Sequence, residues 1–221
     1  SLVDYLESGS FDKIVIGKAG WSALEKELVR LLNCGSPKTT MEFLALAVKN
    51  KVSMVLSGGT GSGKTTFLNT LLKEIPDSER IITIEDTKEL TPSQKNRVSL
   101  LISRNDQGLA NVDATKLLEA CLRMRPDRIL MGELRGKEAF AFIRAINTGH
   151  PGSITTIHAN SPRGAYEQLA LMVMQGETEL TKDAVITYLS SVIPLVIQID
   201  KADGKAGRIG EIFYAPATLM E

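Results

Sequence analysis

The sequence is poor in cysteine, and the cysteines that it has form no motif. Cys34 and Cys121 lie far apart and make no CxxC pair. A structural zinc site built from cysteine is therefore not expected, and the cysteine count gives no reason to infer an oxidising compartment. We find no internal repeat and no low-complexity segment, so a repeat architecture is not expected either.

The chain also lacks an excess of charge and a long apolar run. Its 26 basic and 26 acidic residues cancel, which differs from the basic footprint of a dedicated nucleic-acid binder. No stretch approaches the roughly 20 apolar residues of a membrane-spanning helix. There is no signal peptide, and the first residue is Ser1 rather than methionine, so we expect these 221 residues to be part of a longer protein.

What the sequence does contain is a glycine-rich stretch between a strand pattern and a helix pattern. Residues 58–66 read Gly-Gly-Thr-Gly-Ser-Gly-Lys-Thr-Thr, after an apolar run at 52–56 and before apolar residues at helical spacing. This order predicts a phosphate-binding loop, the P-loop. At average residue usage, a chance match in a chain of this length has a probability on the order of one per cent.

The residue types of this stretch suit the phosphates of a nucleotide. Glycines let the backbone turn tightly with its N–H groups inward, and the following helix adds its positive N-terminal end. Lys64 is expected to reach the β- and γ-phosphates, and the Thr65 hydroxyl to hold Mg²⁺. ATP and Mg²⁺ are therefore expected to bind here, at Gly58, Gly59, Thr60, Gly61, Ser62, Gly63, Lys64, Thr65 and Thr66.

Strand and helix patterns alternate along most of the chain, which predicts an α/β fold with a mostly parallel sheet and helices on both faces. Asp203-Gly204 between the last two strand patterns predicts a C-terminal antiparallel hairpin. Strands are predicted at 11–16, 52–56, 80–85, 97–103, 128–131, 153–157, 192–199 and 207–214. Helices are predicted from Ser22 to about Asn33 and at 39–49, 64–74, 113–124, 137–147, 162–174 and 181–190.

Two helix starts carry capping signals, and one helix carries an apolar face. Ser22 with Glu25, and Thr39 with Glu42, match the capping box. In the helix at 137–147 we expect Phe140, Ile143 and Ile146 to face inward. Residues 1–37 are expected to form a linker or accessory segment, and residues 38–221 the main domain.

Chemistry-bearing residues follow several of the predicted strands. Glu85, Glu133 and His158 each stand at the carboxyl end of a strand, and in an open parallel sheet those ends meet at one edge. Glu133 is the best candidate for orienting a water against a γ-phosphate, with Glu85 and its neighbour Asp86 as further candidates. His158 is expected to sense the γ-phosphate by hydrogen bonding, whereas a metal pair of His150 and His158 lacks a further ligand at suitable spacing.

Several arginines stand near Glu133 in the sequence. An arginine can neutralise charge on a transferring phosphoryl group, in its own subunit or across an interface, although most exposed arginines do neither. The candidates are Arg123, Arg125, Arg128 and Arg135.

Four stretches in this order resemble the motifs of the secretion-superfamily traffic ATPases. Residues 58–66, 84–90, 124–136 and 148–160 look like the Walker A, Asp box, Walker B and His box of that family. The sequence is most similar to the ring-forming ATPases of bacterial type IV secretion systems. The resemblance implies a RecA-like fold and carries catalytic roles to Glu133, Glu85, Arg125 and His158, with Arg125 near the phosphates.

The resemblance also implies an assembly and a location. Such ATPases are hexamers of two-domain subunits, so a homohexamer is expected that works in the cytoplasm, peripherally at the bacterial inner membrane, with secretion-system components as partners. Nucleic acid is expected only indirectly, as possible cargo. About 40 residues before the core cannot hold the family's N-terminal domain, so 38–221 is expected to be the C-terminal ATPase domain, weakly active and impaired in hexamer assembly.

Three other functions remain open from the sequence. A type II secretion or pilus ATPase shares the motifs, but that branch often carries a four-cysteine zinc insertion that this chain does not have. A hexameric nucleic-acid translocase shares the loop and would need basic or aromatic pore residues. A nucleotide-responsive scaffold would bind ATP without hydrolysing it.

Overall fold

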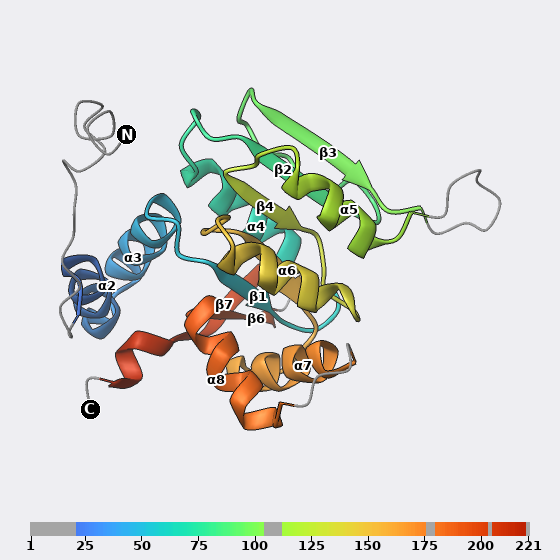
Figure 1. Ribbon diagram of the computed structural model, residues 1–221. Helices are drawn as coiled ribbons and strands as arrows, with labels where there is room; N and C mark the ends of the chain where they lie inside the picture. The colour runs from blue at the N-terminus through green and yellow to red at the C-terminus, as the bar shows by residue number, and fades with distance from the viewer. Residues whose placement is uncertain (1–20, 104–111, 176–179, 203–204, 220–221) are drawn as a thin grey trace, which may run out of the picture.

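Seven strands form one sheet in the computed structural model, which describes residues 21–103, 112–175, 180–202 and 205–219 (Figure 1). The strand predicted at 11–16 and the hairpin turn at 203–204 lie outside the described residues. The strand order is β3-β2-β4-β5-β1-β6-β7; β7 is antiparallel to β6, and the other pairs are parallel. The strands are β1 (Met54–Ser57), β2 (Ile81–Glu85), β3 (Arg97–Leu101), β4 (Arg128–Met131), β5 (Ile154–Ile157), β6 (Leu195–Ala202) and β7 (Lys205–Tyr214).

Helices cover both faces of this sheet. One face carries α5 (Ala114–Leu122), α6 (Glu138–Asn147), α7 (Pro162–Met174) and α8 (Lys182–Val192), whose apolar side chains share one core cluster. The other face carries α2 (Ala23–Cys34), α3 (Pro37–Lys49), α4 (Lys64–Leu71) and the short 3₁₀ helix η1 (Leu72–Glu74). A second 3₁₀ helix, η2 (Ala215–Leu219), follows β7. The predicted α/β architecture with its C-terminal antiparallel pair is confirmed.

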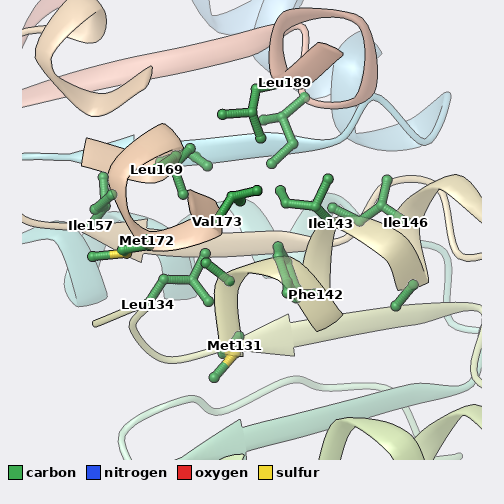
Figure 2. Close-up of a cluster of buried hydrophobic side chains, with 14 of the residues drawn as sticks. Met131, Leu134, Phe142, Ile143, Ile146, Ile157, Leu169, Met172, Val173 and Leu189 are labelled. Carbon is green, nitrogen blue, oxygen red and sulfur yellow. The ribbon is translucent and has the colours of Figure 1, made fainter. Parts of the chain in front are cut away.

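The central strands are apolar on both sides because both sides are covered. In β1, Val55 packs into the cluster under α5–α8, while Met54 and Leu56 pack into the cluster under α2–α4. Figure 2 shows the first cluster, in which side chains from β4, α6, α7 and α8 meet. Full burial of one such side chain contributes about 1.5–3 kcal/mol, so the two clusters are the main stabilising contribution.

The inward face of α6 differs from the prediction at one position. Phe140 is 47% exposed, whereas Phe142 is fully buried together with Ile143 and Ile146. The apolar stripe therefore runs through Phe142 rather than Phe140, because positions 142, 143 and 146 share one side of a helix with 3.6 residues per turn.

The start of α3 also differs from the prediction. The helix begins at Pro37, and its N-cap is Ser36, whose Oγ accepts a hydrogen bond from the Thr39 N–H at 3.2 Å. The Thr39 Oγ1 accepts one from the Ser36 N–H in return, so the reciprocal cap is Ser36 with Thr39 rather than Thr39 with Glu42. Pro37 suits the first helical position because its missing N–H would have no partner there. The Ser22–Glu25 capping box of α2 is confirmed.

Arg128 lies at the edge of the sheet opposite the carboxyl ends of the parallel strands. It is fully buried at the start of β4, and its guanidinium donates to both oxygens of Glu79, at 2.6 and 2.8 Å. A third hydrogen bond, 2.7 Å long, reaches the Val48 carbonyl. Arg128, one of the candidate arginines near Glu133 in the sequence, is therefore not brought beside Glu133, because the two side chains lie at opposite ends of β4.

None of the helices in the described ranges combines the length and the apolar character that crossing a membrane requires.

Candidate functional site

The carboxyl ends of four parallel strands bring the predicted functional segments to one pocket. The loops after β1, β2, β4 and β5 surround a cavity of about 440 Å³. Of the predicted site residues and candidates, those that line it are Thr60, Gly61, Ser62, Gly63, Lys64, Thr65, Thr66, Glu85, Asp86, Glu133, Arg135 and His158. The convergence expected because parallel strands end at the same edge is thus observed, although the sequence could not give the strand order β2-β4-β5-β1.

The P-loop has the conformation that its glycines allow. Gly61 and Gly63 take φ angles of 71° and 89°, a region that side chains with a Cβ rarely adopt. Gly63 is also the N-cap of α4 and supplies no side-chain cap, so the first N–H groups of the helix stay available to an anion. Backbone donors and the helix N-terminus therefore point at the same place, the pocket.

Lys64 is held at the base of the pocket. It is only 8% exposed, and its Nζ donates to the carbonyl oxygens of Gly58 and Gly59, at 2.7 and 3.0 Å. Gly58 and Gly59 thus contribute through their carbonyls rather than by lining the cavity. Burial lowers the pKa of Lys64, and the nearby Glu133 carboxylate opposes that shift.

His158 bridges the lysine and the candidate catalytic carboxylate. Its Nε2 lies 2.8 Å from Oε1 of Glu133, and its Nδ1 lies 3.4 Å from Nζ of Lys64. The other Glu133 oxygen, Oε2, accepts a hydrogen bond from Nη2 of Arg135 at 2.7 Å. Arg135 Nη1 in turn donates to Oδ2 of Asp86 at 2.6 Å. Both oxygens of Glu133 are therefore oriented, and its side chain is 17% exposed.

The two carboxylate oxygens of Glu85 differ in their surroundings. Its Oε1 accepts hydrogen bonds from the backbone N–H groups of Glu89 and Leu90, at 2.9 and 2.8 Å. Its Oε2 is buried and meets no hydrogen-bond donor in the part of the chain that the structure describes. A buried carboxylate oxygen without a donor, in a pocket that the Thr65 hydroxyl also lines, fits a hard cation such as Mg²⁺ or its water shell.

Asn69 is a supporting residue that sequence reasoning missed. From α4 its Nδ2 donates to the Glu89 carbonyl at 2.9 Å, and its Oδ1 accepts from the Thr91 N–H at 2.8 Å. These bonds tie the loop after Glu85 to the P-loop helix. No motif could have indicated this, because an asparagine on a polar helix face is ordinarily solvated.

Arg125 is not brought to the pocket by its own chain. It stands in the turn before β4, at φ 53°, on the sheet edge opposite Glu133, and it is not among the residues that line the pocket. Within one subunit, therefore, the strand β4 separates Arg125 from the pocket. Arg135, by contrast, contacts Glu133.

The two histidines are also separated. His150 Nδ1 lies 2.8 Å from the carbonyl oxygen of Pro126, at the far sheet edge, whereas His158 lies in the pocket. Across the described ranges, no group of three or more His, Cys, Asp and Glu side chains is arranged to hold a metal ion.

Proteins of type IV secretion systems are among those with similar sequences. The type IV secretion system protein VirB11 of Bartonella quintana is 44% identical over 217 residues, which are 97% of this chain and 61% of that protein. VirB11 of Brucella suis is 39% identical over 225 residues, covering 99% of this chain and 62% of that protein. The chain thus spans about three fifths of the length of the curated relatives that it matches.

Solved structures agree with the fold. The crystal structure of the VirB11 ATPase from the Brucella suis type IV secretion system, in complex with sulphate, matches with a TM-score of 0.85 at 38% identity, covering 99% of this chain and 65% of that one. The pilus retraction motor PilT with bound ADP matches with a TM-score of 0.61 at 22% identity, covering 92% and 57%. At that identity PilT shows only that the fold is shared. The expected RecA-like core is confirmed.

A family model also matches the chain. The model described as "Type II/IV secretion system protein" covers residues 13–203, which include the P-loop, Glu85, Glu133 and His158. Because this match spans most of the chain, the protein belongs to the type II/IV secretion system protein family.

Proposed function

We propose that this chain binds MgATP in the pocket and hydrolyses it, as a subunit of a ring ATPase that powers type IV secretion. The observation that carries the proposal is the contact series Lys64–His158–Glu133, with its distances of 3.4 and 2.8 Å. It places a phosphate-binding cation, a polar bridge and a carboxylate side by side. A P-loop that served binding alone would not need the carboxylate.

The geometry supports separate roles in phosphoryl transfer for the P-loop, Glu133 and His158. The backbone N–H groups at Gly61–Lys64 and the Lys64 ammonium hold the β- and γ-phosphates, and Mg²⁺, when bound near Thr65 and Glu85, neutralises phosphate charge. Glu133 orients a water and accepts its proton as the water oxygen bonds to the γ-phosphorus and the bond to the β-phosphate oxygen breaks. His158 contacts both groups and is placed to report whether the γ-phosphate is present.

The division of the chain and its assembly are part of the same proposal. Residues 38–221 form the RecA-like ATPase domain, and residues 1–37 a linker or accessory segment. The relatives named VirB11 support a role in type IV secretion. The resemblance of the four motifs implies the rest of the proposal, a homohexamer at the cytoplasmic side of the inner membrane beside other secretion-system components. Arg125, on the edge away from its own pocket, then has its phosphate-binding role at a neighbouring subunit's nucleotide.

Two substitutions separate binding from hydrolysis. We expect Lys64→Ala to lose ATP binding, because it removes the buried cation, and Glu133→Gln to bind ATP without turning it over. Binding is measured by calorimetry and turnover by phosphate release. Lys73→Ala and Glu119→Gln, at exposed positions on η1 and α5, are the matched controls and should behave as wild type.

The outcomes separate the competing functions. Normal hydrolysis by Glu133→Gln contradicts the assignment of the carboxylate. Binding without hydrolysis in the wild type favours a nucleotide-responsive scaffold, and stimulation of hydrolysis by DNA favours a nucleic-acid translocase.

A further inference from the structure

The C-terminal hairpin packs directly against the P-loop. β6 lies beside β1 in the sheet and runs parallel to it, with Ser57 opposite Gln198, so the next residues of both strands come out at the same edge. β7 returns along β6 and contacts α4, the helix that follows the P-loop. The hairpin β6–β7 is therefore a neighbour of the loop, although residues 67–194 lie between them in the sequence.

The contact between loop and hairpin has no room for side chains. A Cβ on Gly207 of β7 would overlap the carbonyl oxygen of Ser62, and a Cβ on Gly63 would lie 3.0 Å from the Gly207 nitrogen. On the other side of the loop, a Cβ on Gly58 would overlap the carbonyl oxygen of Ile199 in β6. Side-chain atoms of Ile199 and Ser62 also lie within overlap distance, but the nearest obstructing atom at each of these glycines belongs to the backbone, which cannot rotate away as a side chain does. Loop and hairpin are thus in contact backbone to backbone.

The strand that meets the loop is irregular at this point. The pairing of β6 with β7 shifts register between Gln198 and Ile199 and again between Asp200 and Ala202. Such irregularities bend a strand and re-aim its residues, and they are frequent beside active sites. Ile199 is 1% exposed and packs in the core under α2–α4, so the piece of β6 that touches the loop is itself anchored.

We propose that the hairpin β6–β7 supports the P-loop and fixes its conformation, and that Gly207 is a positioning residue for nucleotide binding. Gly207 does not contact the nucleotide; it acts through Ser62 and Gly63, whose backbone shapes the phosphate cradle. The inference depends on the proposed function, because it concerns how tightly the same pocket holds a nucleotide. Since coupling between two sites is reciprocal, a nucleotide that fixes the loop also stabilises the hairpin.

The first test is Gly207→Ala, with Gly210→Ala as the matched control. Both glycines lie in β7, but a Cβ on Gly210 would meet the side-chain carboxylate of Asp200, which can move aside. We expect Gly207→Ala to raise the Kd for MgADP and for a non-hydrolysable ATP analogue by about tenfold or more, because moving the Ser62–Gly63 backbone weakens hydrogen bonds from the loop to charged phosphate oxygens. Gly210→Ala should stay within about twofold. The kcat of Gly207→Ala at saturating ATP should fall by a smaller factor than the affinity of this variant for nucleotide, since Glu133 and His158 are not displaced.

The second test uses the wild-type chain and therefore does not depend on how Gly207→Ala folds. Amide hydrogen exchange is measured with and without the magnesium complex of the ATP analogue. We expect the analogue to slow exchange in the loop 58–66 and also in residues 205–210 of β7. Slower exchange in the loop with unchanged exchange in 205–210, or unchanged affinity in a folded Gly207→Ala, overturns the inference alone. A wild-type chain that does not bind the analogue overturns the proposed function and the inference with it.

Discussion

At the scale of single residues, the site depends on one charged side chain that holds two carboxylates. Arg135 lies between Glu133 and Asp86, at 2.7 and 2.6 Å, and so fixes the orientation of the carboxylate expected to activate water. Its own side chain is half exposed, so it is positioned by these ion pairs rather than by burial. A planar guanidinium suits this place because it presents two donors in a fixed geometry.

Replacing Arg135 should therefore affect turnover more than binding. We expect Arg135→Gln to lower kcat on the order of 10- to 100-fold, because Glu133 loses its orientation, while the Kd for ATP stays within about twofold. Arg135→Lys should recover part of kcat, since it keeps the charge and loses the fork. Phosphate release and calorimetry measure the two quantities, and Arg144→Gln, exposed on α6, is the control. An unchanged kcat in Arg135→Gln would show that Glu133 is oriented without it.

At the scale of elements, each functional loop is held by the element beside it. Asn69 ties the P-loop helix α4 to the loop after β2, and Glu85 ties the same loop to the end of its own strand. On the other side, the hairpin β6–β7 contacts the P-loop at Gly207. The P-loop and its helix α4 thus lie between the loop after β2 and the hairpin β6–β7, which are separate parts of the chain.

The helix before β1 offers a test of how its N-terminus is capped. Because Ser36 rather than Thr39 is the N-cap of α3, we expect Ser36→Ala to lower the free energy of unfolding by about 1 kcal/mol. Glu42→Ala should change it by less than about 0.5 kcal/mol, since Glu42 is exposed and lies outside the capping contacts. Urea denaturation of both variants measures the difference. A cost for Glu42→Ala as large as that for Ser36→Ala would instead support the cap predicted from Thr39 and Glu42.

At the scale of the whole molecule, the edge of the sheet formed by the carboxyl ends of the parallel strands differs from the edge formed by their amino ends. The carboxyl edge gathers the loops of the pocket, whereas the opposite edge is closed by the buried pair of Arg128 and Glu79, with Lys51 3.4 Å from Asp127 nearby. A buried charge pair is costly to break because it leaves one charge without its partner. The Arg80 N–H that donates to Asp127 lowers the pKa of that carboxyl below its ordinary value, which further favours its ionised form at this edge.

Assembly is the property that belongs to the molecule as a whole. We expect a polypeptide limited to these 221 residues to form a ring incompletely and to hydrolyse ATP slowly, because the matched parts make up only about three fifths of the curated relatives, and the remaining part of such a protein can contribute subunit contacts. Light scattering with and without MgATP gives the mass, and phosphate release gives the rate. A stable hexamer with rapid hydrolysis would contradict this expectation.

The sequence by itself determined the local features of this protein. The P-loop could be recognised because its glycines, lysine and threonines are contiguous and flanked by a strand and a helix. Glu85, Glu133 and His158 could be placed in one pocket because parallel strands end at the same edge. Both depend on spacing along the chain, which a sequence displays directly.

Only the tertiary structure decided which distant residues complete the site. It placed Arg128 with Glu79 and Arg135 with Glu133, although both are arginines that stand within five residues of Glu133 in the sequence. It likewise revealed Asn69 and Gly207, which match no motif, because each of them contacts a loop that is separated from it in the sequence. Asn69 contacts the loop after β2, and Gly207 contacts the P-loop. The physical reason is that hydrogen bonds and steric contacts act over a few ångströms in space. Strand order and register, rather than spacing in the sequence, set which residues come within that range.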